Sequence, residues 1–145
     1  SEAGLPAVAD PGAQLVKVAQ QKRIQVVPLV GPSSILLALM ASGMNGQNFA
    51  FHGYLPIDKT ERNKKLAHLE AESAKTGIAQ IFMETPYRNN QMVDDLTKIL
   101  RAETKICVAC HITLEDEDIR TLSIKEWKNE KYDFHKRPAI FVMQA

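Results

Sequence analysis

The chain has 145 residues, of which 45% are apolar and 24% are charged, and its formal net charge is +1. These values are typical of a globular protein and exclude an intrinsically disordered chain. Seven glycines and two cysteines exclude a collagen and a disulfide-stabilised scaffold. The longest apolar run, residues 35–41, is far shorter than the roughly 20 residues of a membrane span, so we expect no membrane partner.

The first third of the chain contains two predicted helices and one predicted strand. Apolar spacing over residues 13–22 predicts a helix, preceded by a turn in which Asp10 is a candidate cap. Residues 24–29 form a short β-branched run of the kind found in buried parallel strands. A Gly-Pro-Ser-Ser loop then opens an apolar helix over residues 35–42, and Gly43 is the expected stop.

The remainder alternates strands with helices. Strands are predicted over residues 49–54, 78–83, 105–112, 118–122 and 139–143. Helices are predicted over residues 58–75, 89–100 and 123–131. Ser123 and Glu126 have the spacing of a capping box at the start of the last helix. This alternation predicts an α/β fold with a largely parallel sheet, and the polar stretch 43–48 is the best internal boundary.

Cys107, Cys110 and His111 match the C-x-x-C-H pattern of covalent haem attachment. The pattern lies in a predicted strand, where successive side chains alternate between the two faces. The two thiols therefore point to opposite sides and cannot readily chelate one metal ion or form a disulfide. We expect two core cysteines and no metal site.

Three Gly- and Pro-containing loops follow predicted strands or precede helices, at residues 2–12, 31–34 and 84–88. In open α/β sheets, ligands bind beyond the carboxyl ends of the strands, where a helix N-terminus offers free N–H donors. The same residue types also dominate ordinary turns, so the loops alone leave both interpretations open.

Four segments, taken together, resemble the tetrapyrrole methylase superfamily. Residues 1–12 resemble its S-D-A-G-x-P-x-x-x-D-P-G loop, and residues 27–34 resemble its V-P-x-P-G-P-S/C loop. Residues 51–56 resemble F-x-G-F-L-P, and residues 82–88 resemble F-Y-E-S-P-H-R. The order and spacing match over most of the chain, and the motif versions are nearest to those of the superfamily's RNA-modifying branch.

The resemblance implies a tetrapyrrole methylase-like α/β fold with a mixed sheet flanked by helices. Residues 1–48 are then the end of an N-terminal lobe that binds S-adenosylmethionine (SAM), and residues 49–145 are a complete C-terminal lobe. Because the start of the N-terminal lobe is missing, we expect these residues alone to be inactive. The resemblance places the following residues at the cofactor: Ala3, Gly4, Pro6, Ser33, Ser34, Tyr54, Leu55, Pro138 and Ala139.

The implied reaction is 2′-O-methylation of a ribose in small-subunit rRNA. Glu84 is the candidate base that accepts the ribose proton. The alternative is that Glu84 has no catalytic role and forms a surface ion pair with Arg88. Arg88, Lys136 and Arg137 are the candidate RNA contacts. Lys59, Arg62, Lys64 and Lys65 form a second basic cluster, which is more typical of a solvated helix face.

Departures from the branch's pattern keep other functions open. Cys110 and His111 stand where the branch has Arg-Glu, and Glu115 stands at its Lys, so two cationic residues are lost. Methylation of a tetrapyrrole or another small molecule, and a non-catalytic dimerisation module, are the alternatives. The resemblance also implies a homodimer. The N-terminus shows no basic-then-apolar leader, so we expect a cytoplasmic protein.

Overall fold

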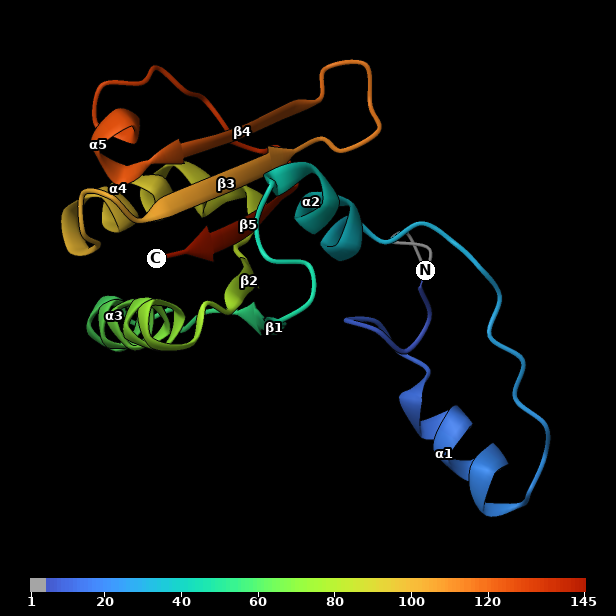
Figure 1. The fold of residues 1–145 in the computed structure, drawn as a ribbon. Coiled ribbons are helices and arrows are strands. Elements are labelled where there is room, and N and C mark those ends of the chain that lie inside the picture. The colour runs from blue at the N-terminus through green and yellow to red at the C-terminus, as the bar shows by residue number, and fades with distance from the viewer. Residues whose placement is uncertain (1–4) are drawn as a thin grey trace.

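A computed structural model describes residues 5–145, so the predictions for Ala3 and Gly4 lie outside the described residues. Its centre is a five-stranded sheet in the order β1-β2-β5-β3-β4 (Figure 1). The strands are β1 Phe49–Tyr54, β2 Ala79–Met83, β3 Lys105–Cys110, β4 Asp118–Ser123 and β5 Ala139–Gln144. All five were expected from the sequence to within two residues at either end.

The sheet is mixed. β1 and β2 are parallel and are joined by α3 (Lys59–Thr76), as the strand–helix–strand pattern requires. β5 is inserted between β2 and β3 and is antiparallel to both, and β4 is antiparallel to β3. The expectation of a largely parallel sheet is therefore wrong. The alternating pattern orients β1, β2 and β3 alike, but it does not reveal that the last strand enters between two of them.

Each face of the sheet is covered by helices. α2 (Ser34–Ser42) packs on one face, where Ile35, Ala38 and Leu39 meet small and β-branched side chains of the central strands. α3, α4 (Asn89–Ile99) and the short α5 (Ile124–Trp127) contribute to the core of the other face. The mixed, helix-flanked α/β fold implied by the resemblance is confirmed.

The helix ends follow the sequence in most places. Gly43 ends α2 at φ 71°, a left-handed conformation that glycine adopts without steric cost. Ser123 and Glu126 form the expected capping box. The helix they begin ends at Trp127 rather than at residue 131, and the buried Trp127 indole donates to the carbonyl of Ile106.

The chain from residue 13 to residue 32 stands apart from the sheet (Figure 1). α1 (Ala13–Gln21) extends away from it and has no buried residue. Residues 24–29 form no strand and are exposed, so that prediction is wrong for this structure. A strand needs a hydrogen-bonding neighbour, and none lies beside this run within residues 5–145.

The two cysteines lie on opposite faces of β3, as predicted. Cys107 belongs to the core beneath α2, and Cys110 belongs to the core of the other face. Both are free thiols, and burial raises the pKa of each. No cluster of metal-ligating side chains occurs among the described residues. None of the helices in the described part of the chain has the length and apolar character of a membrane span.

Candidate functional site

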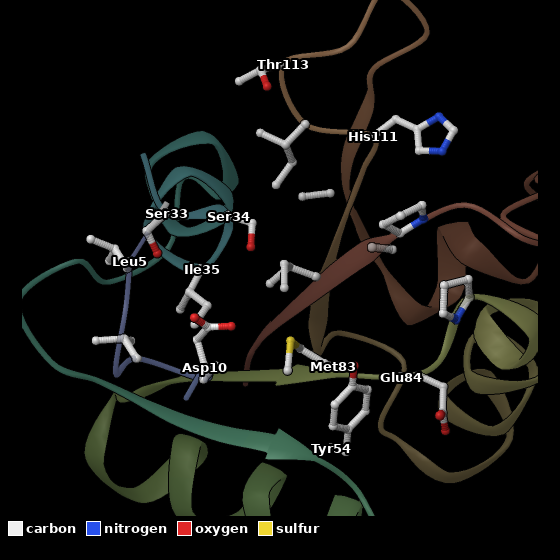
Figure 2. Close-up of a pocket in the computed structure, with 18 of the residues that line it drawn as sticks. Leu5, Asp10, Ser33, Ser34, Ile35, Tyr54, Met83, Glu84, His111 and Thr113 are labelled. Atoms are coloured by element: carbon white, nitrogen blue, oxygen red, sulfur yellow. The ribbon is translucent and has the colours of Figure 1, made fainter. Parts of the chain in front are cut away.

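A cavity of about 600 Å³ lies at one edge of the sheet (Figure 2). Because β1, β2 and β3 run in the same direction, their carboxyl ends meet at this edge, and the antiparallel β5 begins there. Tyr54 and Glu84 come from the first two of these ends and Ala139 from the start of β5. The volume lies within the range of small-molecule and cofactor sites.

The opposite wall is built by two segments that precede the sheet in sequence. One is the loop from Leu5 to Asp10, and the other is the start of α2 from Ser33 to Ile35. The loop between β3 and β4 adds Thr113 and Leu114 to the lining. Figure 2 shows Thr113 at the upper edge of the cavity. Residues far apart in the sequence therefore share one cavity.

Six of the predicted site residues line this cavity. They are Ser33, Ser34, Tyr54, Glu84, Pro138 and Ala139. Pro6 is exposed and is not part of the lining, although its neighbour Leu5 is. Leu55 is also absent from the lining, because its side chain is buried in the core with Phe82. The assignment of Leu55 to the cofactor therefore receives no support from its side-chain position.

Ser33 and Ser34 lie at the N-terminus of α2. Neither hydroxyl makes a hydrogen bond to another described residue, and α2 has no side-chain cap. The first N–H groups of a helix have no partner within the helix, so this end of α2 offers donors at the cavity wall. The local chemistry suits a carboxylate or a hydroxyl of a ligand.

Glu84 is buried rather than part of an exposed surface pair. Its Oε1 atom accepts hydrogen bonds from the Thr85 amide at 2.6 Å and from Arg88 Nε and Nη2 at 3.0 and 2.6 Å. The structure shows no bond to Oε2 from the described residues. Arg88 therefore neutralises Glu84 and fixes its orientation at the end of β2.

The three predicted RNA contacts lie beside the cavity. They differ in whether their side chains are already hydrogen-bonded within the protein. Arg88 forms an ion pair with Glu84. Arg137 donates through Nη2 to the Asp116 carbonyl at 2.5 Å and to the Asp116 carboxylate at 3.3 Å. Lys136 is exposed, and its side chain makes no hydrogen bond within the described residues. Its backbone N–H donates to the Pro86 carbonyl at 3.0 Å, which places this loop next to the end of β2.

One residue of the second basic cluster, which lies on α3, is not available at the surface. Arg62 is buried and donates through Nη2 to Asp95 Oδ2 at 2.7 Å, so it cannot contact RNA. Lys64 is exposed and pairs with Glu61 along the helix. The cluster is mainly a solvated helix face, which the sequence analysis favoured over an RNA contact.

Two ionisable residues of the cavity lining, Asp10 and His111, were not assigned to the site from the sequence. Asp10 was interpreted as a helix cap, but α1 has Gly12 at that position and no side-chain cap bond. His111 was considered as part of the cysteine motif and as a departure from the RNA branch's pattern, but not as a site residue. It lies at the cavity rim, where its Nδ1 is 2.7 Å from Asp116 Oδ2, and this hydrogen bond is the largest cause that lowers the pKa of Asp116. The D-P-G loop motif was the available signal for Asp10.

A ligand-sized cavity at the carboxyl edge of the sheet is the usual position of a small-molecule site in an α/β protein. A family model described as Tetrapyrrole (Corrin/Porphyrin) Methylases matches residues 1–128. The chain belongs to this family.

Relatives with assigned names support the same placement. Ribosomal RNA small subunit methyltransferase I of Vibrio cholerae is 36% identical over 87% of this chain and 42% of its own length. The protein of the same name from Pasteurella multocida is 33% identical over 100% of this chain and 51% of its own length. The chain thus spans about half the length of the curated relatives it matches.

Two solved structures share the fold. The methyltransferase CobJ matches with a TM-score of 0.61 at 15% identity, over 97% of this chain and 61% of that chain. Uroporphyrin-III C-methyl transferase from Thermus thermophilus, complexed with S-adenyl homocysteine, matches with a TM-score of 0.52 at 14% identity. That match covers 97% of this chain and 62% of that one, and both likenesses concern the fold alone.

Proposed function

We propose that the protein is a SAM-dependent methyltransferase that methylates a ribose 2′-hydroxyl in small-subunit rRNA. The observation that carries the proposal is the match, at 36% identity over 87% of this chain, to a relative named for that RNA. The family supports methyl transfer, and the cavity supplies a place for the donor.

The cavity residues fit SAM by their chemistry. The α2 N-terminus and the two serine hydroxyls suit the polar amino-acid end of the molecule. Apolar side chains such as Ile35, Met83 and Ile140 suit a flat adenine ring. Asp10 adds a carboxylate that makes no hydrogen bond or ion pair to another described residue, and a cationic ligand would satisfy it.

When bound, SAM supplies a methyl group on a positively charged sulfur. The protein's contribution is to hold donor and acceptor in line and to exclude water, which provides much of the rate of a displacement reaction. Pro138 and Ala139 would contact the adenine from the start of β5. Ser33 and Ser34 would orient the amino-acid end from α2, and Tyr54 would contact the cofactor from the end of β1.

Glu84 is the proposed base for the acceptor's proton. It lines the cavity, and Arg88 holds one carboxylate oxygen while the other accepts no bond within the described residues. A carboxylate oriented in this way can accept a proton from a hydroxyl that lies within hydrogen-bond distance. Lys136 and Arg137, on the loop beside this site, are proposed to contact the RNA backbone.

A tetrapyrrole or another small molecule is the second candidate acceptor. It is favoured by the family description and by Cys110 and His111, which replace two residues of the RNA branch's pattern. The two candidates separate in one assay. The complete gene product is incubated with labelled SAM and either rRNA from a strain that lacks the gene or a mixture of tetrapyrrole precursors. Label only in the tetrapyrroles would overturn the RNA proposal.

The organisation of the complete protein is also a proposal. We propose that residues 1–48 belong to the SAM-binding lobe, that residues 49–145 form the second lobe, and that the protein acts as a homodimer in the cytoplasm. Sedimentation equilibrium of the complete gene product tests the dimer, and a mass equal to one chain at micromolar concentration would contradict it.

A further inference from the structure

Tyr87 is a large aromatic side chain that the proposed reaction does not use, and it is 69% exposed. It stands where the F-Y-E-S-P-H-R pattern has histidine. It lies in the short 3-10 helix η1 (Pro86–Arg88), which follows Glu84 at the end of β2. Because Pro86 lines the cavity, Tyr87 lies on the surface directly beside it.

A second exposed ring accompanies Tyr87. His135, on the loop before β5, has its ring centroid 6.0 Å from that of Tyr87, and the two ring planes meet at 72°. In this edge-to-face arrangement the edge of one ring meets a face of the other, so the pair does not cover both faces of either ring. With Tyr87 largely in solvent, an aromatic face remains open on which a flat ligand ring can stack.

The loop that carries His135 is fixed against η1. The backbone N–H of Lys136 donates to the Pro86 carbonyl at 3.0 Å. The backbone N–H of Phe134 donates to the Asn90 side-chain oxygen at 2.8 Å. A surface that is already ordered loses little conformational entropy when a ligand binds, so these bonds favour binding at the two rings.

A positive charge lies next to the rings. Lys136 is exposed and directly follows His135. Asp133, an acidic residue of the same loop, accepts hydrogen bonds through Oδ1 from Asn90 Nδ2 and from the His135 amide, each at 3.0 Å. Its carboxylate is therefore engaged by the loop itself. An open aromatic face beside a lysine is the combination with which proteins bind single-stranded nucleic acid.

We propose that Tyr87 and His135 form a stacking platform for one unpaired base of the RNA, and that Lys136 contacts a phosphate next to that base. The proposal rests on the proposed function and specifies how the same site would recognise RNA. Bases within a duplex are stacked on their neighbours, so the platform requires a single-stranded stretch. Because η1 directly follows Glu84, a base held there would keep a neighbouring ribose close to the proposed catalytic carboxylate.

Substitutions of Tyr87 in the complete gene product test the platform, with small-subunit rRNA from a strain that lacks the gene as the probe. Tyr87→Leu keeps an apolar side chain without an aromatic face, and Tyr87→Phe keeps the face. Loss of one stacked base weakens RNA binding by about 10-fold. We therefore expect Tyr87→Leu to raise the KM for RNA about 10-fold and to leave kcat and SAM affinity within about twofold. Tyr87→Phe should behave like the wild type.

The salt dependence of RNA binding separates stacking from charge. Lys136→Ala should weaken binding and reduce the slope of log affinity against log salt by about 1, because one phosphate contact is lost. Tyr87→Leu should leave that slope unchanged, because stacking releases no counterions. The matched control is Lys128→Ala, which removes an exposed lysine at the end of α5 and should change neither the affinity nor the slope.

The outcomes distinguish this proposal from the proposed function. An unchanged KM for RNA in Tyr87→Leu, or an equal rise in Tyr87→Phe, overturns the platform and leaves the proposed function intact. A loss of SAM affinity in Tyr87→Leu as large as the rise in KM also overturns it, because the effect is then a general structural one. A wild-type protein that methylates tetrapyrrole precursors but not the rRNA overturns the proposed function and the platform with it.

Discussion

Replacing Arg62 with leucine should strongly destabilise the part of the chain that positions Tyr54. Arg62 donates through Nε and Nη2 to Asp95 Oδ2 at 3.2 and 2.7 Å. Its Nη1 donates to the carbonyls of Pro56 and Ile57 at 3.2 and 2.7 Å. One side chain therefore ties the segment after β1 to both α3 and α4.

The magnitude follows from burial. The side chains of Arg62 and Asp95 are 7% and 1% exposed, and the substitution leaves Asp95 with a single side-chain donor, Gln91 at 3.0 Å. Breaking a buried ion pair by removing one partner costs about 3–5 kcal/mol. That is a large share of the roughly 5–15 kcal/mol that stabilises a typical domain. Arg62→Leu combined with Asp95→Leu should cost less than Arg62→Leu alone, because no unpaired charge remains.

Urea unfolding of the 145-residue chain, followed by the emission of Trp127, measures this loss. Trp127 is the chain's single tryptophan and is buried in the same core as Leu66 and Leu96. The control is Lys64→Ala, which removes an ion pair on the same helix whose side chains are 70% and 60% exposed. The control should cost less than about 1 kcal/mol. Equal costs for Arg62→Leu and Lys64→Ala would refute the reasoning.

Three further predictions concern the site, the core and a helix end. Glu84→Gln should lower methyl transfer at least about 100-fold and leave SAM affinity within about twofold, as loss of a base requires; weaker SAM binding would contradict the assignment. Burial raises the pKa of Cys107 and Cys110, so both should stay protonated and unreactive toward Ellman's reagent at pH 8, and should react only in urea. Gly43→Ala should cost about 1 kcal/mol in urea unfolding because φ is 71° there, whereas Gly46→Ala, with no such φ and no near neighbour, should cost almost nothing.

Local chemistry made most of the elements predictable. The Ser123–Glu126 box, the Gly43 stop and the opposite faces of Cys107 and Cys110 depend on residues close in sequence, and all three predictions are confirmed. The direction of β5 was not predictable, because it depends on where the last strand enters the sheet. Residues 24–29 have strand-like composition, but a strand also needs a neighbour that a pattern cannot supply.

The site was predictable where its residues belong to recognisable loops. Ser33, Ser34 and Ala139, which the resemblance assigned to the cofactor, line the cavity, and their contact with a cofactor stays a prediction. Leu55 occupies the core instead, because the direction of a side chain at the end of a strand depends on local packing. Arg62 and Asp95 are 33 residues apart in the sequence, so no local pattern predicts that they pair.

The most direct test of the proposed function is the identity of the methylated nucleoside. The complete gene product is incubated with labelled SAM and small ribosomal subunits from a strain that lacks the gene, and the rRNA is digested to nucleosides. We expect label in one 2′-O-methylated nucleoside. Label on a base, or no label in the RNA, would contradict it.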